Sequence, residues 1–133
     1  MRWLLTRLLV MGIAAIFERA EGGEFTLHGN QGDFTTADSY QPYQLPLNAN
    51  AVKQCAPPAM SGKSSDGPDG WPYYNLQMPG GGVILAVGWP GQWSSRFARD
   101  AGQGLRVTAG QELTRLSLQP GEQIRTPLIA VLF

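Results

Sequence analysis

The chain has 133 residues, enough for one domain whose core needs neither disulfides nor a structural metal. Ten basic and ten acidic residues give a formal net charge of zero, and without a block of like charge nothing favours nucleic acid or an acidic membrane surface. Seventeen glycines and ten prolines indicate many tight turns between short strands. The composition therefore predicts an all-β fold.

An apolar segment, residues 1–23, opens the chain and precedes a predicted domain at 24–133. Arg2 and Arg7 stand ahead of an apolar run, as in a secretory signal peptide, and this run is too short for a stable membrane span. The charges at 18–21 do not suit a cleavage site, so the segment can equally supply core strands of a chain that starts upstream. Localisation stays open between the cytoplasm and export.

A polar loop follows a short predicted strand at 25–28. Asp33 and Asp38 lie near Tyr40 in this loop, and carboxylates beside an aromatic ring can bind sugar hydroxyls and stack on a pyranose. The simpler interpretation, which we favour, is that Asp38 and Thr35 cap the loop's own backbone.

Two short edge strands are predicted at 44–47 and 51–54, and a Pro-, Ser- and Gly-rich surface loop at 56–70. Cys55 lies between them as the single cysteine, so it cannot form an internal disulfide. A half-buried thiol at a strand end is a better interpretation of Cys55 than a catalytic nucleophile.

Aromatic residues mark the next segment, 71–76. Trp71, Tyr73 and Asn75 match a carbohydrate-binding surface, on which rings stack against a sugar and an amide binds its hydroxyls. Aromatic residues in strands more often pack in a core, and for Tyr73 and Tyr74 we favour that alternative.

The apolar run 83–87 predicts a central strand buried on both faces. After a turn at 89–91, Trp93, Ser95 and Phe97 alternate with polar residues, as in a strand with one buried face. These two strands are predicted to form a hairpin.

Further one-sided strands are predicted at 105–109 and 114–118, followed by a type II turn at 119–122, where Pro precedes Gly. Pro127 marks the start of a final apolar strand at 128–133. Because that apolar strand would otherwise be exposed, we expect either more chain or a partner to cover it.

Reaction chemistry is not evident in the sequence, because no nucleophile elbow, zinc helix or phosphate-binding loop is present. The triple glycine at 80–82 precedes a strand, so it lacks the helix dipole that holds phosphate. The aspartates have no spacing that would place two of them across a glycosidic bond. We therefore predict no catalytic residue, no metal site and no cofactor in this chain.

Three segments carry a family resemblance: LHGNQGDFTTADSYQPY, DGWPYYNLQMPGGGVILAVGWPGQWSSRFARD and AGQELTRLSLQPGEQIRTPLIAVLF. Over residues 24–133 the chain resembles the N-terminal β-sandwich of α-galactosidase-like proteins of glycoside hydrolase family 36. The resemblance implies an antiparallel sandwich of the galactose-mutarotase-like kind, here incomplete at its front. It also implies a following (β/α)₈ barrel, whose two aspartates cleave α-galactosides with retention, and sandwich loops that help to wall the sugar pocket.

The chain departs from the family pattern because the motifs of both catalytic aspartates are missing from it. We therefore expect a non-catalytic accessory domain or fragment that packs against a barrel. A galactoside or other glycan would be contacted through Asp33, Asp38, Trp71, Tyr73 and Asn75. The alternative function is a small secreted carbohydrate-binding or adhesion-like module.

Overall fold

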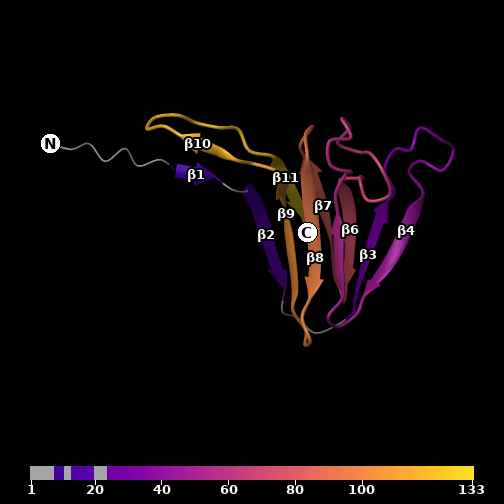
Figure 1. Cartoon of the computed structure of the whole chain (residues 1–133). Helices are drawn as coiled ribbons and strands as arrows, with labels where there is room; N and C mark the ends of the chain where they lie inside the picture. Colours follow the sequence, from indigo (N-terminus) through magenta and orange to yellow (C-terminus); the bar gives the residue numbers. More distant parts are fainter. Residues whose placement is uncertain (1–7, 11–12, 20–23) are drawn as a thin grey trace.

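The computed structural model describes residues 8–10, 13–19 and 24–133. Over these residues the protein is an antiparallel β-sandwich without helices, which confirms the predicted fold class (Figure 1). In the same ranges there is no helix of the length and apolar character needed to cross a bilayer.

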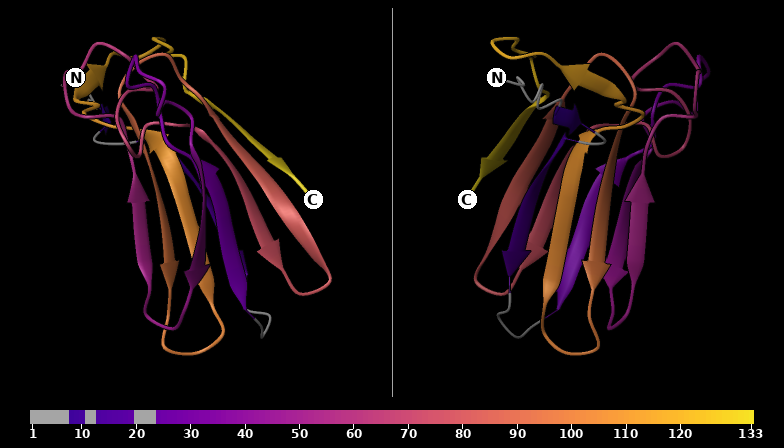
Figure 2. Two further views of the ribbon diagram at one scale, coloured as in Figure 1. Left: turned by 90° about the vertical axis from the view of Figure 1, so that its right-hand side faces the viewer. Right: turned by 60° about the vertical axis from the view of Figure 1, so that its left-hand side comes forward.

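One layer is a five-stranded sheet in the order β11-β7-β6-β3-β4. Its strands are β3 (Phe25–Asn30), β4 (Pro42–Leu47), β6 (Tyr73–Met78), β7 (Gly81–Gly88) and β11 (Leu128–Leu132). Pro79 and Gly80 join β6 to β7 in a tight turn, for which Gly80 takes a φ of +77°. The strands β11 and β4 form the two edges of this sheet (Figure 2).

The second layer is a four-stranded sheet in the order β2-β9-β8-β5. Its strands are β2 (Ile13–Arg19), β5 (Val52–Cys55), β8 (Trp93–Arg99) and β9 (Leu105–Gln111). A separate ribbon pairs β1 (Leu8–Val10) with β10 (Leu116–Leu118). The described part of the apolar N-terminal segment thus forms strands, and β2 pairs with β9 in the four-stranded sheet, while residues 1–7, 11–12 and 20–23 lie outside the described residues.

The predicted hairpin between residues 83–87 and 93–97 is wrong. The strand β7 pairs with β6 and β11, whereas β8 pairs with β5 and β9 in the opposite layer. The turn at 89–91 is therefore a crossover between the sheets. The sequence favoured a hairpin because a short turn that contains Gly and Pro has the same composition whether it joins two strands of one sheet or connects one sheet to the other.

The core lies between the two layers. Trp93, Ser95 and Phe97 are 0%, 1% and 0% exposed, which confirms the predicted one-sided strand. The prediction that residues 83–87 are buried on both faces is wrong, because Ile84 is 51% exposed on the outer face. An unbroken apolar run here marks one buried face and one apolar outer face.

Several predicted turns and edges are confirmed. The strands β4 and β5 are both edge strands. The turn at 119–122 is of type II, because Gly121 has a φ of +88° and the Glu122 N–H donates to the Gln119 carbonyl at 3.0 Å. Between β8 and β9, the Asp100 carboxylate accepts the Gly102 and Gly104 N–H groups at 2.8 and 3.0 Å.

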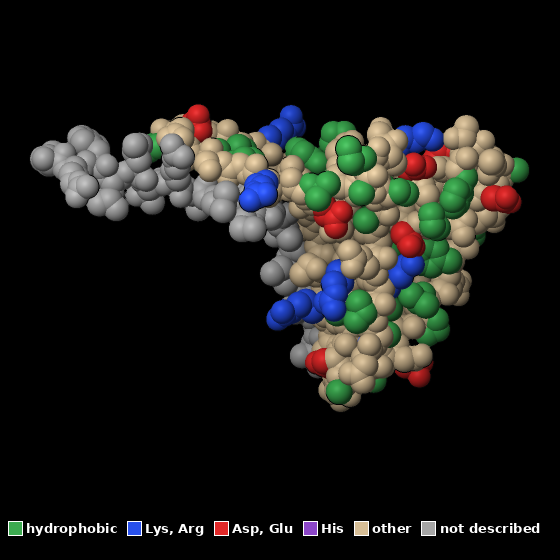
Figure 3. Space-filling model, viewed as in Figure 1, with side chains coloured by type: hydrophobic (Ala, Val, Ile, Leu, Met, Phe, Trp, Pro, Cys, Tyr) green, Lys and Arg blue, Asp and Glu red, His purple; other side chains and the backbone are tan. Residues whose placement is uncertain are grey.

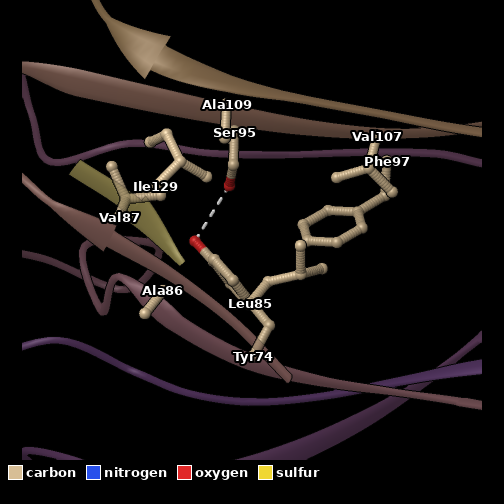
Figure 4. A pocket seen from close by; sticks show the side chains of 9 residues that line it. All are labelled: Tyr74, Leu85, Ala86, Val87, Ser95, Phe97, Val107, Ala109 and Ile129. Carbon is tan, nitrogen blue, oxygen red and sulfur yellow. Dashed lines mark hydrogen bonds between the residues drawn. The ribbon is translucent and has the colours of Figure 1, made fainter. Parts of the chain in front are cut away.

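One polar contact links the two layers inside the core. Ser95 on β8 donates to the Tyr74 hydroxyl on β6 at 3.0 Å, beside a cavity of about 10 Å³ (Figure 4). That volume is at the lower limit for a single water molecule. The cavity is therefore a packing gap and not a ligand site.

Candidate functional site at the loop end

Two long connections lie against each other at one end of the sandwich, residues 31–41 and 56–72 (Figures 1 and 2). The Gly32 N–H donates to the Gly67 carbonyl at 2.9 Å, and the Asp33 N–H donates to the Ser65 carbonyl at 2.6 Å. A Cβ atom on Gly32 would lie 2.2 Å from the Ser65 carbonyl oxygen. Only glycine therefore allows the two loops to approach this closely. We term this region the loop end.

The connection 56–72 is anchored to the sandwich by side chains of neighbouring strands. The indole N–H of Trp93 donates to the Ser64 carbonyl at 2.6 Å, and the Gln92 amide donates to the Pro57 carbonyl at 2.8 Å. Lys53 on β5 forms an ion pair with Asp69. The surface loop predicted at 56–70 thus contains no regular strand, but contacts to the four-stranded sheet fix its path.

Asp33 is engaged in holding the loop end together. Its carboxylate accepts the Thr35 N–H at 2.7 Å and the Ser39 hydroxyl at 3.3 Å, and it forms an ion pair with Lys63 at 3.4 Å. The hydrogen bond from the Thr35 backbone is the main reason why the pKa of Asp33 is lowered, and Lys63 lowers it further. The favoured interpretation, backbone capping, therefore describes this loop, but Asp33 is the capping residue and not Asp38.

Three aromatic side chains form a cluster at the loop end, here termed the ring cluster: Tyr40, Trp71 and Tyr73. The centroids of Tyr40 and Trp71 are 5.1 Å apart in an edge-to-face arrangement, and those of Trp71 and Tyr73 are 5.5 Å apart. Tyr40 and Tyr73 remain 46% and 51% exposed. The cluster therefore presents ring surface to solvent.

The alternative of core packing, which we favoured for Tyr73 and Tyr74, describes only the second tyrosine. Tyr74 is 3% exposed and packs edge-to-face on Phe97 at 5.0 Å. Successive side chains of a strand point to opposite faces, so Tyr73 projects outward from β6.

Asn75 and Asp38 are exposed, and each is two residues from a member of the ring cluster. Asn75 is exposed on the outer face of β6, two residues beyond Tyr73, and its cross-strand neighbours are His28 and Ile84. Asp38 is exposed within the loop 31–41. Of the five predicted site residues, the structure thus joins Trp71 and Tyr73 by a ring contact, and Asp33 and Asp38 both lie in the same loop as Tyr40.

A shallow hollow of about 290 Å³ lies beside the loop end. Its lining includes Met60, Lys63, Pro90 and Leu113. Met60 and Leu113 have φ angles of +61° and +56° and are 93% and 76% exposed. The surface of the hollow is chiefly apolar. Lys63, which also lines it, has its ammonium group in the ion pair with Asp33.

Cys55 is buried more deeply than predicted. It is 1% exposed at the end of β5, and the Tyr43 hydroxyl lies 3.8 Å from its Sγ atom. Burial raises the pKa of the Cys55 thiol, which keeps it protonated at neutral pH. The thiol therefore has the environment of a structural cysteine and not that of a nucleophile.

Charges of both signs are interspersed on the face shown in Figure 3, without a continuous single-sign patch. Within residues 24–133, no three His, Cys, Asp or Glu side chains are grouped as a metal site would require. The loop end thus combines exposed aromatic rings with hydrogen bonds and ion pairs that hold its two loops together.

The site residues chosen from the sequence omitted Tyr40 and Lys63. Tyr40 was noted as a ring able to stack, but its contact with Trp71 depends on a φ of +64° that brings the loop back toward β6. Lys63 is one of two lysines in the chain, and each of the two forms an ion pair with an aspartate at this end. Lys63 is 30 residues from Asp33 in the sequence, so no local pattern identifies the pair.

Comparison of the chain with known protein families and with curated proteins found no match to either.

Proposed function

We propose that this chain is a non-catalytic β-sandwich domain of an α-galactosidase-like glycoside hydrolase, and that its loop end contacts sugar beside a catalytic barrel. The observation that carries the proposal is the ring cluster, exposed at one end of a rigid sandwich. The resemblance to glycoside hydrolase family 36 is the reason for proposing a catalytic (β/α)₈ barrel as the neighbouring domain.

The ring cluster has the features of a weak carbohydrate-binding surface. The apolar face of a pyranose stacks on aromatic rings, and nearby hydroxyl and amide groups bind its hydroxyls. Trp71 contacts both tyrosines, so its orientation is constrained before a ligand arrives. A surface of this size without an enclosing pocket fits millimolar affinity for a single sugar ring.

Two aspartates at the loop end have structural roles. Asp33 is paired with Lys63, and Asp69 is paired with Lys53. A retaining glycosidase instead needs two carboxyl groups about 5 to 5.5 Å apart across the scissile bond, one of them able to donate a proton. The lowered pKa of Asp33 makes it a poor proton donor. On this proposal the bond-breaking acids belong to the barrel.

A titration tests the sugar contact. Methyl α-galactoside is added to tens of millimolar while Trp fluorescence is followed, with methyl α-glucoside as the comparison sugar. We expect a saturable change in the wild type and its loss in Trp71→Ala. Met60→Ala is the matched control, because Met60 is exposed within the loop end but lies outside the ring cluster. An unchanged wild-type signal would remove the sugar contact from the proposal.

Sequencing of the coding DNA beyond the codon for Phe133 tests the family part separately. A reading frame that encodes a (β/α)₈ barrel with two suitably placed aspartates supports the proposal. A different downstream domain would contradict it, whatever the titration shows.

A second candidate function uses the same ring cluster in a small secreted carbohydrate-binding or adhesion-like module. The signal-like composition of residues 1–23 favours this candidate. Mass spectrometry of the exported product would support it by showing cleavage near Gly22, which would remove β2 from the four-stranded sheet. An uncleaved chain in the cytoplasm would contradict it.

A further inference from the structure

The outer face of the five-stranded sheet carries an apolar surface along one edge, here termed the edge patch: Ile84, Ala86, Leu128, Ala130 and Leu132. Strand pairing makes it continuous, because Leu132 lies beside Ile84 and Ala130 beside Ala86. Leu128, Leu132 and Ile84 are 76%, 64% and 51% exposed. Grouped apolar side chains of this kind mark an interaction surface.

The edge strand beneath this patch lacks the protection that other edges of the molecule have. In the same sheet, the opposite edge strand β4 carries Pro42 and Pro46, which have no N–H to offer a further strand. In the other sheet, the edge strand β5 has four residues and includes the charged Lys53. The strand β11 has neither proline nor charge within its bounds. Among the described strands only β7 pairs with β11, so the outer backbone groups of β11 are a template for another strand.

The sequence of β11 is symmetric in side-chain type about its central residue. It reads Leu-Ile-Ala-Val-Leu, with Ala130 at the centre. In an antiparallel pair of two such strands centred on Ala130, each leucine faces a leucine and each β-branched residue faces a β-branched residue. Cross-strand pairs of matched apolar residues stabilise a sheet, and here no charged pair opposes the arrangement. This self-complementarity favours a second β11 as the strand that pairs with the edge.

We propose that β11 is a self-association edge, at which a second copy of this chain adds its own β11 in antiparallel orientation about a two-fold axis through Ala130. The two five-stranded sheets then become one continuous sheet, and the two edge patches join on its outer face. The contact is isologous, so it closes as a dimer and does not propagate. The edge patch and the ring cluster have no residue in common, but they adjoin on the outer face, because Tyr73 lies beside Ala86.

The dimer should be of modest affinity. A standard interface buries about 800 Å² on each partner, whereas the edge patch offers on the order of a few hundred Å² besides the backbone ladder. We therefore expect a dissociation constant in the micromolar range.

Sedimentation velocity over a concentration series measures dimerisation of the whole chain. We compare the wild type with variants that carry a charge at Ala130, on the two-fold axis. The variant Ala130→Lys places two like charges opposite each other, and Ala130→Glu does the same. Each should weaken dimerisation more than about tenfold, because like charges that face each other across an interface oppose association. An equimolar mixture of the two variants should restore the dimer, because the opposed charges are then complementary. Recovery in the mixture also shows that both variants are folded.

Gln44→Lys is the matched control, since Gln44 is exposed in the edge strand β4 of the same sheet. Its dimerisation should equal that of the wild type. A wild type that is monomeric at hundreds of micromolar would overturn the proposal. So would a dimer that persists in Ala130→Lys, and so would open-ended assembly, which a two-fold contact does not produce.

Discussion

The long connection at 56–72 and the edge strand β11 differ in an unexpected way. The connection has almost no regular structure, yet Trp93, Gln92 and Lys53 hold it against the sandwich through hydrogen bonds and an ion pair. The strand β11 is regular, yet Leu128 and Leu132 are mostly exposed and only one neighbouring strand pairs with it. Regular backbone structure and local stability are thus separate properties, because stability depends on burial and on how many partners a segment has.

The largest expected effect comes from removing the main anchor of the long connection. Trp93→Ala should lower the free energy of unfolding by about 3 to 5 kcal/mol, because it empties a fully buried site. In contrast, Leu128→Ala on β11 should change it by no more than about 0.5 kcal/mol in dilute solution. Urea denaturation measures both. Similar values for the two variants would contradict the comparison.

A smaller loss is expected where the two loops meet. Gly32→Ala should cost about 1 to 3 kcal/mol, because the new Cβ atom would collide with the Ser65 carbonyl oxygen and force the loops apart. Gly81→Ala is the matched control, since a Cβ atom at Gly81 meets no atom within 4 Å. Thermal unfolding of the two variants measures the difference, and equal stability would show that the close approach is unimportant.

Amide hydrogen exchange compares the two regions directly. The N–H groups of Gly32 and Asp33 are hydrogen-bonded to the long connection, so they should exchange about tenfold or more slowly than the outward-facing amides of β11. The measurement belongs at a concentration low enough to keep the chain monomeric. Faster exchange at Gly32 than along β11 would reverse the comparison.

The smallest effect concerns pH at the loop end. The pKa of Asp33 is lowered in the folded state, so the stabilisation from its carboxylate is present above the ordinary aspartate pKa of about 3.9 and is lost as the pH falls through the lower folded value. The Thr35 amide resonance should titrate with a midpoint below about 3.9. Asp33→Asn should abolish that titration, and a midpoint at or above the ordinary value would contradict the assigned hydrogen bond.

Composition was sufficient to predict the fold class, and alternation was sufficient to predict the buried face of β8, because one-sided burial leaves a period of two in the sequence. It failed for β7, where the outward residue Ile84 is as apolar as its buried neighbours. Which sheet a strand joins also escaped prediction, since the turn at 89–91 has the composition of a hairpin turn. Partner choice depends on contacts between distant residues.

The candidate site was only partly predictable for the same reason. Trp71 and Tyr73 are close in sequence, so their proximity followed from strand geometry. The approach of Tyr40 depends on its own left-handed backbone conformation and on hydrogen bonds between two separate loops. Asn75 lies two residues beyond Tyr73 on the same outer face of β6, as the pleat of a strand requires.

The hydroxyl pair between Tyr74 and Ser95 has a consequence for how the two layers are aligned. Apolar side chains tolerate small translations of one sheet across the other, whereas a buried hydroxyl that loses its partner costs about 1 to 3 kcal/mol. The hydrogen bond therefore favours the one lateral position of the two sheets in which the hydroxyl groups of Tyr74 and Ser95 meet. Replacing both residues together, with Phe and Ala, would leave the protein folded but free to sample neighbouring alignments.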